Sequence, residues 1–293
     1  LIAILLPSLS VAQELTPRAY WPAPTGTQVL SVGAMHTRGD IIPDPSLPIS
    51  GLDSKITSLQ VGYLRTLDFF GRSANLIVDL PYASGETIVD SDIVGTVERD
   101  YRGVGDLGVT LSVNLLGAPA LTPEAFAELR LDPPPIIGAS LRVVAPTGDY
   151  DEDRVINVGA NRWAAKLEMG SVFRLHPKWL LELEAGAWFF GDNDEFLGNR
   201  TREQDAIYSA EMHLVHRFQP GFWASLDVNG YKGGRSRVDG RRLDDLQRDS
   251  KIGFTLVFPF ARKQAIKASY AYGSVNDSAE SFDIFSLSYQ RVF

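Results

Sequence analysis

Polar and apolar residues alternate along most of the chain. Strict alternation places one class of side chain on each face of a pleated strand, so each alternating run predicts a strand. The runs predict twelve strands, at about residues 27–38, 54–68, 72–86, 104–116, 135–147, 161–174, 178–190, 204–218, 221–234, 247–260, 263–274 and 281–293. Most exceed the five or six residues that are usual in soluble sheets.

The connections between these strands alternate between two lengths. Short turns are expected at residues 70–72, 176–177, 219–221 and 261–262, and long polar loops at about 39–53, 87–103, 148–160, 191–203, 235–246 and 275–280. A helical insert at 117–134 falls on the short-turn side, with Thr122 as its cap and Pro123 as the first helical residue. An even strand number with this loop asymmetry is the layout of a bacterial outer-membrane barrel.

The predicted fold is therefore all-β, a transmembrane antiparallel up-and-down β-barrel of about 12 strands of the bacterial outer-membrane type. A closed barrel removes the edges that long amphipathic strands would otherwise expose. Aromatic residues near strand ends, such as Tyr63, Trp163 and Tyr270, fit the interfacial girdles. A soluble β-sandwich or propeller is the alternative, but no blade-length repeat is visible.

The first residues are expected to direct export. Residues 1–12 are apolar and end in the small-x-small pattern Ser10-Val11-Ala12, which predicts a signal peptide truncated at its start. Residues 13–26 are then expected to form a periplasmic lead-in, and 27–293 the barrel. The terminal aromatic residue Phe293 predicts recognition by the barrel insertion machinery.

Composition removes several classes of function. The 293 residues carry a formal net charge of −8 and contain no cysteine. An acidic chain lacks the basic face of a nucleic-acid binder, so no nucleic-acid partner is expected. Without cysteine there is no disulfide, zinc–thiolate site or thiol nucleophile. The sequence suggests no cofactor and no metal-ligating set.

The same alternation assigns residues to the lumen or to lipid. Leu141, Leu167, Leu183, Phe254 and Leu287 are predicted to face lipid, and Ser140, Glu168, Glu184, Gly253 and Ser288 the lumen. The lumen-lining candidates are Arg142, Lys166, Glu168, Glu182, Glu184, Glu211, Asp227, Lys251 and Lys267, with Asp79 and Asp106 also inside. A turn of odd length at 175–177 predicts Glu168 opposite Glu184, in one cluster with Lys166 and Arg142. The alternative is that these side chains are simply hydrated.

Three loop motifs have a structural as well as a functional interpretation. Residues 103–108 spell a dinucleotide fingerprint, but a strand rather than a helix follows them, so glycines entering a strand are favoured. The acidic clusters 149–153 and 192–195 are interpreted as solvated loops or as calcium ligands. The basic loop 232–248 either pairs internally or meets lipopolysaccharide phosphates.

Several segments resemble the outer-membrane family labelled as the MetA-pathway of phenol degradation. They are residues 15–24, 102–108, 114–121, 159–163 and 188–196, which together span nearly the whole chain. The resemblance implies a transporter-like barrel in the outer membrane that passes small organic compounds. It implies no defined catalytic residues.

The sequence thus predicts passive transport or binding of small hydrophobic or aromatic compounds. The alternatives are a structural or envelope-interaction barrel with a plugged lumen and, less favoured, an outer-membrane hydrolase, which would need a serine beside a histidine and an orienting group. The expected partners are outer-membrane lipid, lipopolysaccharide, the insertion machinery and a small hydrophobic solute.

Overall fold

The structure is a computed structural model that describes residues 16–40, 53–91, 95–154, 156–273 and 282–293. The predicted signal peptide at 1–12 and residues 13–15 lie outside this part of the chain. Among the described residues, no helix is long and apolar enough to cross a membrane.

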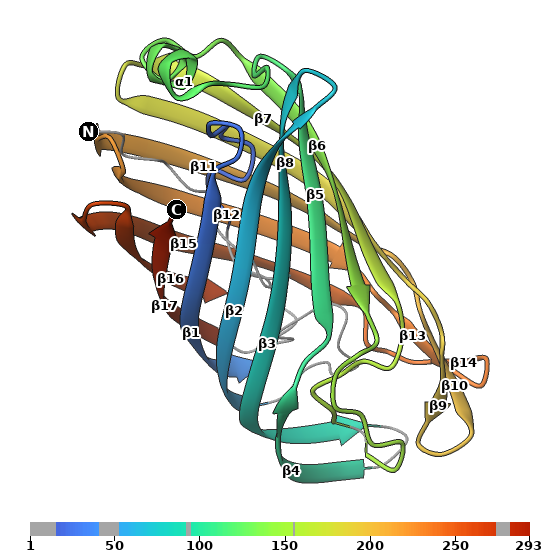
Figure 1. Cartoon of the computed structure of the whole chain (residues 1–293). Coiled ribbons are helices and arrows are strands. Elements are labelled where there is room, and N and C mark those ends of the chain that lie inside the picture. Colours follow the sequence, from blue (N-terminus) through green and yellow to red (C-terminus); the bar gives the residue numbers. More distant parts are fainter. Residues whose placement is uncertain (1–15, 41–52, 92–94, 155, 274–281) are drawn as a thin grey trace.

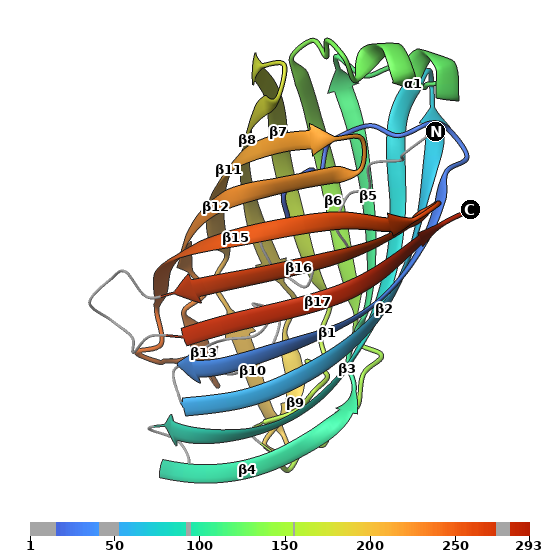
Figure 2. The same ribbon diagram turned by 90° about the vertical axis from the view of Figure 1, so that its left-hand side faces the viewer.

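Thirteen strands form one antiparallel sheet that closes on itself (Figures 1 and 2). They are β1 (Gln28–Asp40), β2 (Asp53–Phe69), β3 (Arg72–Ser91), β4 (Gly95–Val104), β5 (Leu107–Leu116), β6 (Ile136–Ala145), β7 (Ala164–His176), β8 (Trp179–Phe190), β11 (Ile207–Gln219), β12 (Phe222–Gly233), β15 (Gln247–Ala261), β16 (Gln264–Gly273) and β17 (Phe282–Val292). Closure follows because β1 pairs with both β2 and β17. Strands β4 and β5 pair with successive parts of β3 and count as one barrel strand, so the prediction of a twelve-stranded barrel is confirmed.

The break between β4 and β5 explains the glycine-rich motif at 103–108. Asp106 lies in the break and accepts hydrogen bonds from the backbone N–H groups of Thr147 (3.0 Å), Gly148 (2.7 Å) and Ala160 (2.8 Å). A Cβ atom at Gly103 would lie 2.9 Å from the Cβ of Asp149, so a larger residue would push this loop away. The motif therefore anchors the 147–160 loop to the barrel wall, which agrees with glycines entering a strand rather than with a dinucleotide fingerprint.

The two faces of the barrel differ as the alternation predicts. Leu141, Leu167, Leu183, Phe254 and Leu287 lie on the outer face with 40–53% of their surface exposed. On the inner face Glu168 and Glu184 retain 9% and 4%. An apolar outer surface on every strand is the surface that a lipid bilayer covers.

The two ends of the barrel differ in their connections. At one end lie the two-residue turns and the insert that carries α1 (Pro123–Leu129), where Ala125 N–H donates to Thr122 Oγ1 at 3.2 Å, the capping that the sequence predicts. At the other end a second sheet is built from β9 (Asn193–Phe196), β10 (Arg200–Gln204), β13 (Ser236–Val238) and β14 (Arg241–Arg242) (Figure 1). Arg237 on β13 pairs with Glu203 (3.4 Å) and Asp205 (2.6 Å), so at least part of the basic loop is internally paired.

One predicted register is wrong. Glu168 lies opposite Gly186 rather than Glu184, and Glu184 lies opposite Gly170 on one side and Glu211 on the other. The hairpin between β7 and β8 turns at residues 177–178 and contains a bulge between Arg174 and His176. The turn at 177–178 alone would place Glu168 opposite Ala187, and the one-residue bulge moves the pairing to Gly186, two residues from the expected Glu184.

Candidate functional site

The described residues that precede β1, from residue 16 onward, enter the barrel. Arg18 and Trp21 are fully buried and Tyr20 is 2% exposed, and the segment enters at the end where β1 starts (Figure 1). Tyr20 and Trp21 pack with Phe126 of α1 and with inner-face residues such as Val215 and Trp223. The sequence predicts a periplasmic lead-in at 13–26, and of these residues the described stretch 16–24 lies within the barrel. Residues 16–24, here called the plug segment, occupy the lumen because their aromatic side chains find an apolar cluster there.

Tyr20 sits in a notch made by two glycines. Gly138 on β6 and Gly170 on β7 are direct partners across the sheet, and a Cβ atom on either would approach the Tyr20 ring to 2.3 or 2.1 Å. The Tyr20 hydroxyl donates to Glu168 Oε1 at 3.1 Å and lies 3.1 Å from Ser140 Oγ. Burial and the nearby Glu168 carboxylate raise the pKa of Tyr20, so the phenol stays protonated and remains a donor.

Burial of the Arg18 guanidinium in the lumen costs desolvation free energy. Its backbone N–H donates to Glu182 Oε2 at 2.5 Å, and its guanidinium lies 4.3 Å from the ring centre of Trp21 and 5.4 Å from that of Trp223. Burial lowers the pKa of Arg18 to about 9, an effect that Glu182 partly offsets. Among the described residues, its three guanidinium nitrogens have no hydrogen-bond partner. Cation–π contacts replace only part of the lost hydration, so the buried guanidinium opposes docking of the plug segment.

The lumen candidates from the sequence all lie on the inner face, and nearly all are buried. Side-chain exposure is 12% for Arg142 and 14% for Lys166, and residue exposure is 0–9% for Glu168, Glu182, Glu184, Glu211, Asp227, Lys251 and Lys267. Asp79 and Asp106 are also buried.

The predicted charged cluster is only partly correct. Lys166 pairs with Glu168, and its Nζ lies 3.8 Å from Glu211 Oε1. Arg142 instead forms a bidentate pair with Asp79 of β3, at 2.6 and 2.9 Å. Opposite Glu184 lie Gly170 on β7, in place of Glu168, and Glu211 on β11, so the cluster spans β7, β8 and β11.

His213 is a lumen residue that sequence reasoning did not select. It is fully buried on β11, its Nδ1 lies 2.8 Å from Asp227 Oδ1, and Asp227 Oδ2 accepts from Thr255 Oγ1 at 2.8 Å. Alternation places His213 inside, but Asp227 becomes its partner only through the register of β11 with β12. Arg18, Tyr20 and Trp21 were also missed, because they precede the first alternating run.

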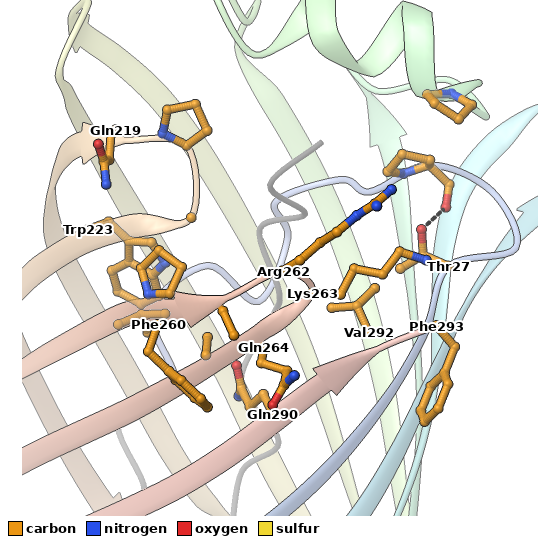
Figure 3. A pocket seen from close by; sticks show the side chains of 18 of the residues that line it. Thr27, Gln219, Trp223, Phe260, Arg262, Lys263, Gln264, Gln290, Val292 and Phe293 are labelled. Carbon is orange, nitrogen blue, oxygen red and sulfur yellow. Dashed lines mark hydrogen bonds between the residues drawn. The ribbon is translucent and has the colours of Figure 1, made fainter. Parts of the chain in front are cut away.

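A large cavity opens beside the plug segment, as Figure 3 shows. It has a volume of about 1090 Å³ and lies between residues 24–27 and the ends of β12, β15, β16 and β17. Trp223, Val257 and Val292 give it apolar walls, whereas Arg262 and Lys263 lie at the hairpin tip that borders it. Thr27 Oγ1 donates to the Pro24 carbonyl at 2.6 Å and holds the chain at the rim.

A second cavity, between β1, β2 and β17, is much smaller. It has a volume of about 30 Å³ and is lined mainly by small and polar residues, including Ser31, Ser58 and Lys267. That volume suits about one water molecule. Twelve strands are intermediate between filled and aqueous barrels, and the described plug segment occupies part of this lumen.

Comparison with known proteins agrees with this geometry. The chain is similar to the COG4313 outer membrane channel from Pseudomonas putida F1, with 24% identity, a TM-score of 0.78, and coverage of 96% of this chain and 100% of that one. It is more distantly similar to the beta domain of the Bordetella autotransporter BrkA, with 12% identity, a TM-score of 0.50, and coverage of 92% and 100%. These likenesses identify the fold as that of outer-membrane barrels. No curated protein matches the chain.

One family model covers most of the chain. It matches residues 51–287 and carries the description "Putative MetA-pathway of phenol degradation". This match extends over all the barrel strands except β1 and the end of β17. The chain therefore belongs to the family described as the MetA-pathway of phenol degradation.

Proposed function

We propose that the protein is an outer-membrane channel for the passive passage of small hydrophobic or aromatic compounds. The observation that carries the proposal is the apolar-walled cavity of about 1090 Å³ beside the plug segment. Transfer of a solute's apolar surface from water to such walls is favourable, by roughly 25 cal/mol per Å² buried. The COG4313 protein that shares the fold is described as a channel, which supports the same class of function.

The lumen favours an apolar solute over a general hydrophilic one. A porin that passes hydrated solutes needs a continuous aqueous channel, which sixteen or more strands usually provide. Here the lumen is occupied by Tyr20, Trp21 and paired charges such as Arg142 with Asp79. A compound that replaces apolar contacts of the plug segment is better suited to this interior than a sugar or an ion.

A structural barrel is the second candidate, and the plug segment favours it. A segment that closes the lumen permanently would leave a barrel that acts only through its surfaces. The buried guanidinium of Arg18 argues against permanent closure, because the docked state lacks hydrogen bonds that water would supply.

An enzyme is the weakest candidate. Ser209 and His213 share the inner face of β11, but residues four apart on a strand are separated by about 13 Å. The pair is therefore too distant for proton transfer.

The outer surfaces suggest the remaining partners. The exposed Arg241 and Arg242 of the second sheet are proposed to contact lipopolysaccharide phosphates. The outer-face leucines are proposed to contact lipid. Phe293, 56% exposed at the end of β17, is proposed as the residue read by the insertion machinery.

Uptake of a labelled aromatic hydrocarbon tests the function. Cells that produce the protein should take up toluene faster than isogenic cells without it, and should take up arabinose at the same rate. Ala265→Trp fills the cavity from the inner face and should reduce toluene uptake. Ile266→Trp changes the next residue, on the outer face, and should leave uptake unchanged. Equal uptake with and without the protein would favour the structural barrel.

A further inference from the structure

Three buried side chains converge in the lumen where β8 and β11 pair. Glu184 and Glu211 are direct cross-strand partners, and His213 follows Glu211 on the same face. Their exposed fractions are 4%, 8% and 0%. One ligand atom from each lies within 4.8 Å of those of the other two. This spacing suits three side chains that bind a single ion.

Each of the three side chains has a buried polar atom without a hydrogen-bond partner. Among the described residues, Glu184 Oε2, Glu211 Oε2 and His213 Nε2 all lack one. His213 Nε2 lies 3.6 Å from Glu211 Oε2, which is longer than a hydrogen bond. Buried polar atoms are nearly always paired, so three that converge on one point indicate a missing partner. Since all three are acceptors when His213 is neutral, that partner carries positive charge or donates a proton.

The hydrogen bonds of His213 prepare its ring as a ligand. The carboxylate of Asp227 has no hydrogen to donate, so His213 Nδ1 carries the proton of the 2.8 Å contact. The lone pair is then on Nε2, which is the atom near Glu211. Thr255 holds the second oxygen of Asp227 at 2.8 Å. A carboxylate that orients a histidine in this way is a recurrent partner of metal-bound histidines.

The local charges leave room for a cation. Lys166 pairs with Glu168 and reaches Glu211 through Oε1, the oxygen that does not face His213. Glu182 lies directly opposite His213 and adds a further buried carboxylate. Arg18 offsets Glu182, whereas Lys166 alone offsets the three carboxylates of Glu168, Glu184 and Glu211. A divalent ion would balance the remaining charge.

We propose that Glu184, Glu211 and His213 bind a divalent transition-metal ion of the Zn²⁺ class within the lumen, with Asp227 as a positioning residue. One imidazole nitrogen with two carboxylates suits zinc and its neighbours better than Ca²⁺ or Mg²⁺, which prefer oxygen ligands alone. The ion ties β8 to β11 and leaves further coordination positions open toward the lumen. The site is independent of the proposed transport.

Metal binding to the purified full chain tests the proposal. The protein is prepared without a polyhistidine tag, stripped with a chelator and titrated with ZnCl₂ by calorimetry, while its folded state is followed by heat-modifiable migration on gels. We expect one Zn²⁺ per barrel, and a visible Co²⁺ spectrum typical of nitrogen and oxygen ligands. No thiolate contributes, because the chain has no cysteine.

Variants locate the ion. Glu184→Gln and His213→Gln should each weaken Zn²⁺ binding by at least about tenfold, and Asp227→Asn by about 10–100-fold through loss of ligand orientation. The controls His176→Gln, exposed at the end of β7, and Glu203→Gln, on β10, should bind like the wild type. A folded wild-type barrel that binds no Zn²⁺, or binds it equally well in all variants, would overturn the proposal. If the wild type binds no metal and Glu184→Gln raises the unfolding temperature, the two carboxylates share a proton instead.

Discussion

Tyr20 is held by the absence of side chains opposite it. The notch exists because two adjacent strands carry glycine at paired positions, Gly138 and Gly170. The aromatic ring lies where the Cβ atoms of any other residue would be. At the same scale, a buried ion pair joins Arg142 to Asp79, and the cation–π contacts of Arg18 replace missing hydrogen bonds.

Gly170→Ala should release the plug segment. The added methyl group would lie 2.1 Å from the Tyr20 ring, and the backbone of a barrel strand cannot move away easily. Trypsin should then cleave after Arg18 in the folded, purified barrel, a bond that is protected in the wild type because Arg18 is fully buried. The control is Gly230→Ala on β12, where the nearest heavy atom would be 3.9 Å away. Similar cleavage of the two variants would show that the notch does not hold the segment.

Arg142→Leu should destabilise the barrel by about 3–5 kcal/mol, because it leaves the carboxylate of Asp79 buried without its cation. Asp79 has 1% side-chain exposure in the pair. The unfolding temperature on heat-modifiability gels measures the loss. Arg154→Leu breaks an exposed pair with Asp151, with side-chain exposures of 57% and 44%, and should cost less than about 1 kcal/mol. The double variant Arg142→Leu with Asp79→Asn should recover part of the stability.

At the scale of the strands, alternation determines which face each residue occupies, and the turns determine which residues meet. Every described barrel strand follows the period of two, so the lipid-facing leucines could be predicted one by one. The β7 partner of Glu184 could not be predicted, since the position of the turn and the bulge between Arg174 and His176 together set the β7–β8 register. A bulge changes pairing without changing the pattern of polar and apolar residues on either side of it.

Leu183→Arg should hinder insertion of the barrel. Leu183 is 40% exposed on the outer face of β8, and a guanidinium near the bilayer midplane costs roughly 2–4 kcal/mol. The fraction of folded protein after refolding into lipid vesicles over a urea series measures this cost. Leu131→Arg makes the same chemical change in the insert after α1, at 68% exposure and outside the strands, and should refold like the wild type. Equal losses in both variants would contradict the face assignment.

The whole molecule has two unlike ends, and the closed sheet separates them. The two-residue turns, α1, the plug segment and the C-terminus lie at one end, and the second sheet with the long connections lies at the other (Figure 2). Outer-membrane barrels keep short turns in the periplasm and long loops outside. We therefore expect the cavity of about 1090 Å³ to open toward the periplasm.

Protease added to intact cells should cut the outer end only. Arg200 and Arg241 are exposed in the second sheet, and Arg262 is exposed in a two-residue turn at the opposite end. Trypsin should cleave after Arg200 or Arg241 and spare Arg262, whereas in permeabilised cells Arg262 should become accessible as well. Mass spectrometry of the released peptides identifies the bonds. Cleavage after Arg262 in intact cells would reverse the orientation.

Sequence alone determined the barrel, the number of its strands, the face of each residue and the cap of α1, because these depend on local alternation, loop length and local hydrogen bonds. The tertiary structure decided the contents of the lumen. Tyr20 reaches Gly170, and Arg142 reaches Asp79, only after the sheet has closed. The grouping of Glu184, Glu211 and His213 likewise depends on the register between β8 and β11. Such contacts join residues far apart in the chain, and no short-range pattern encodes them.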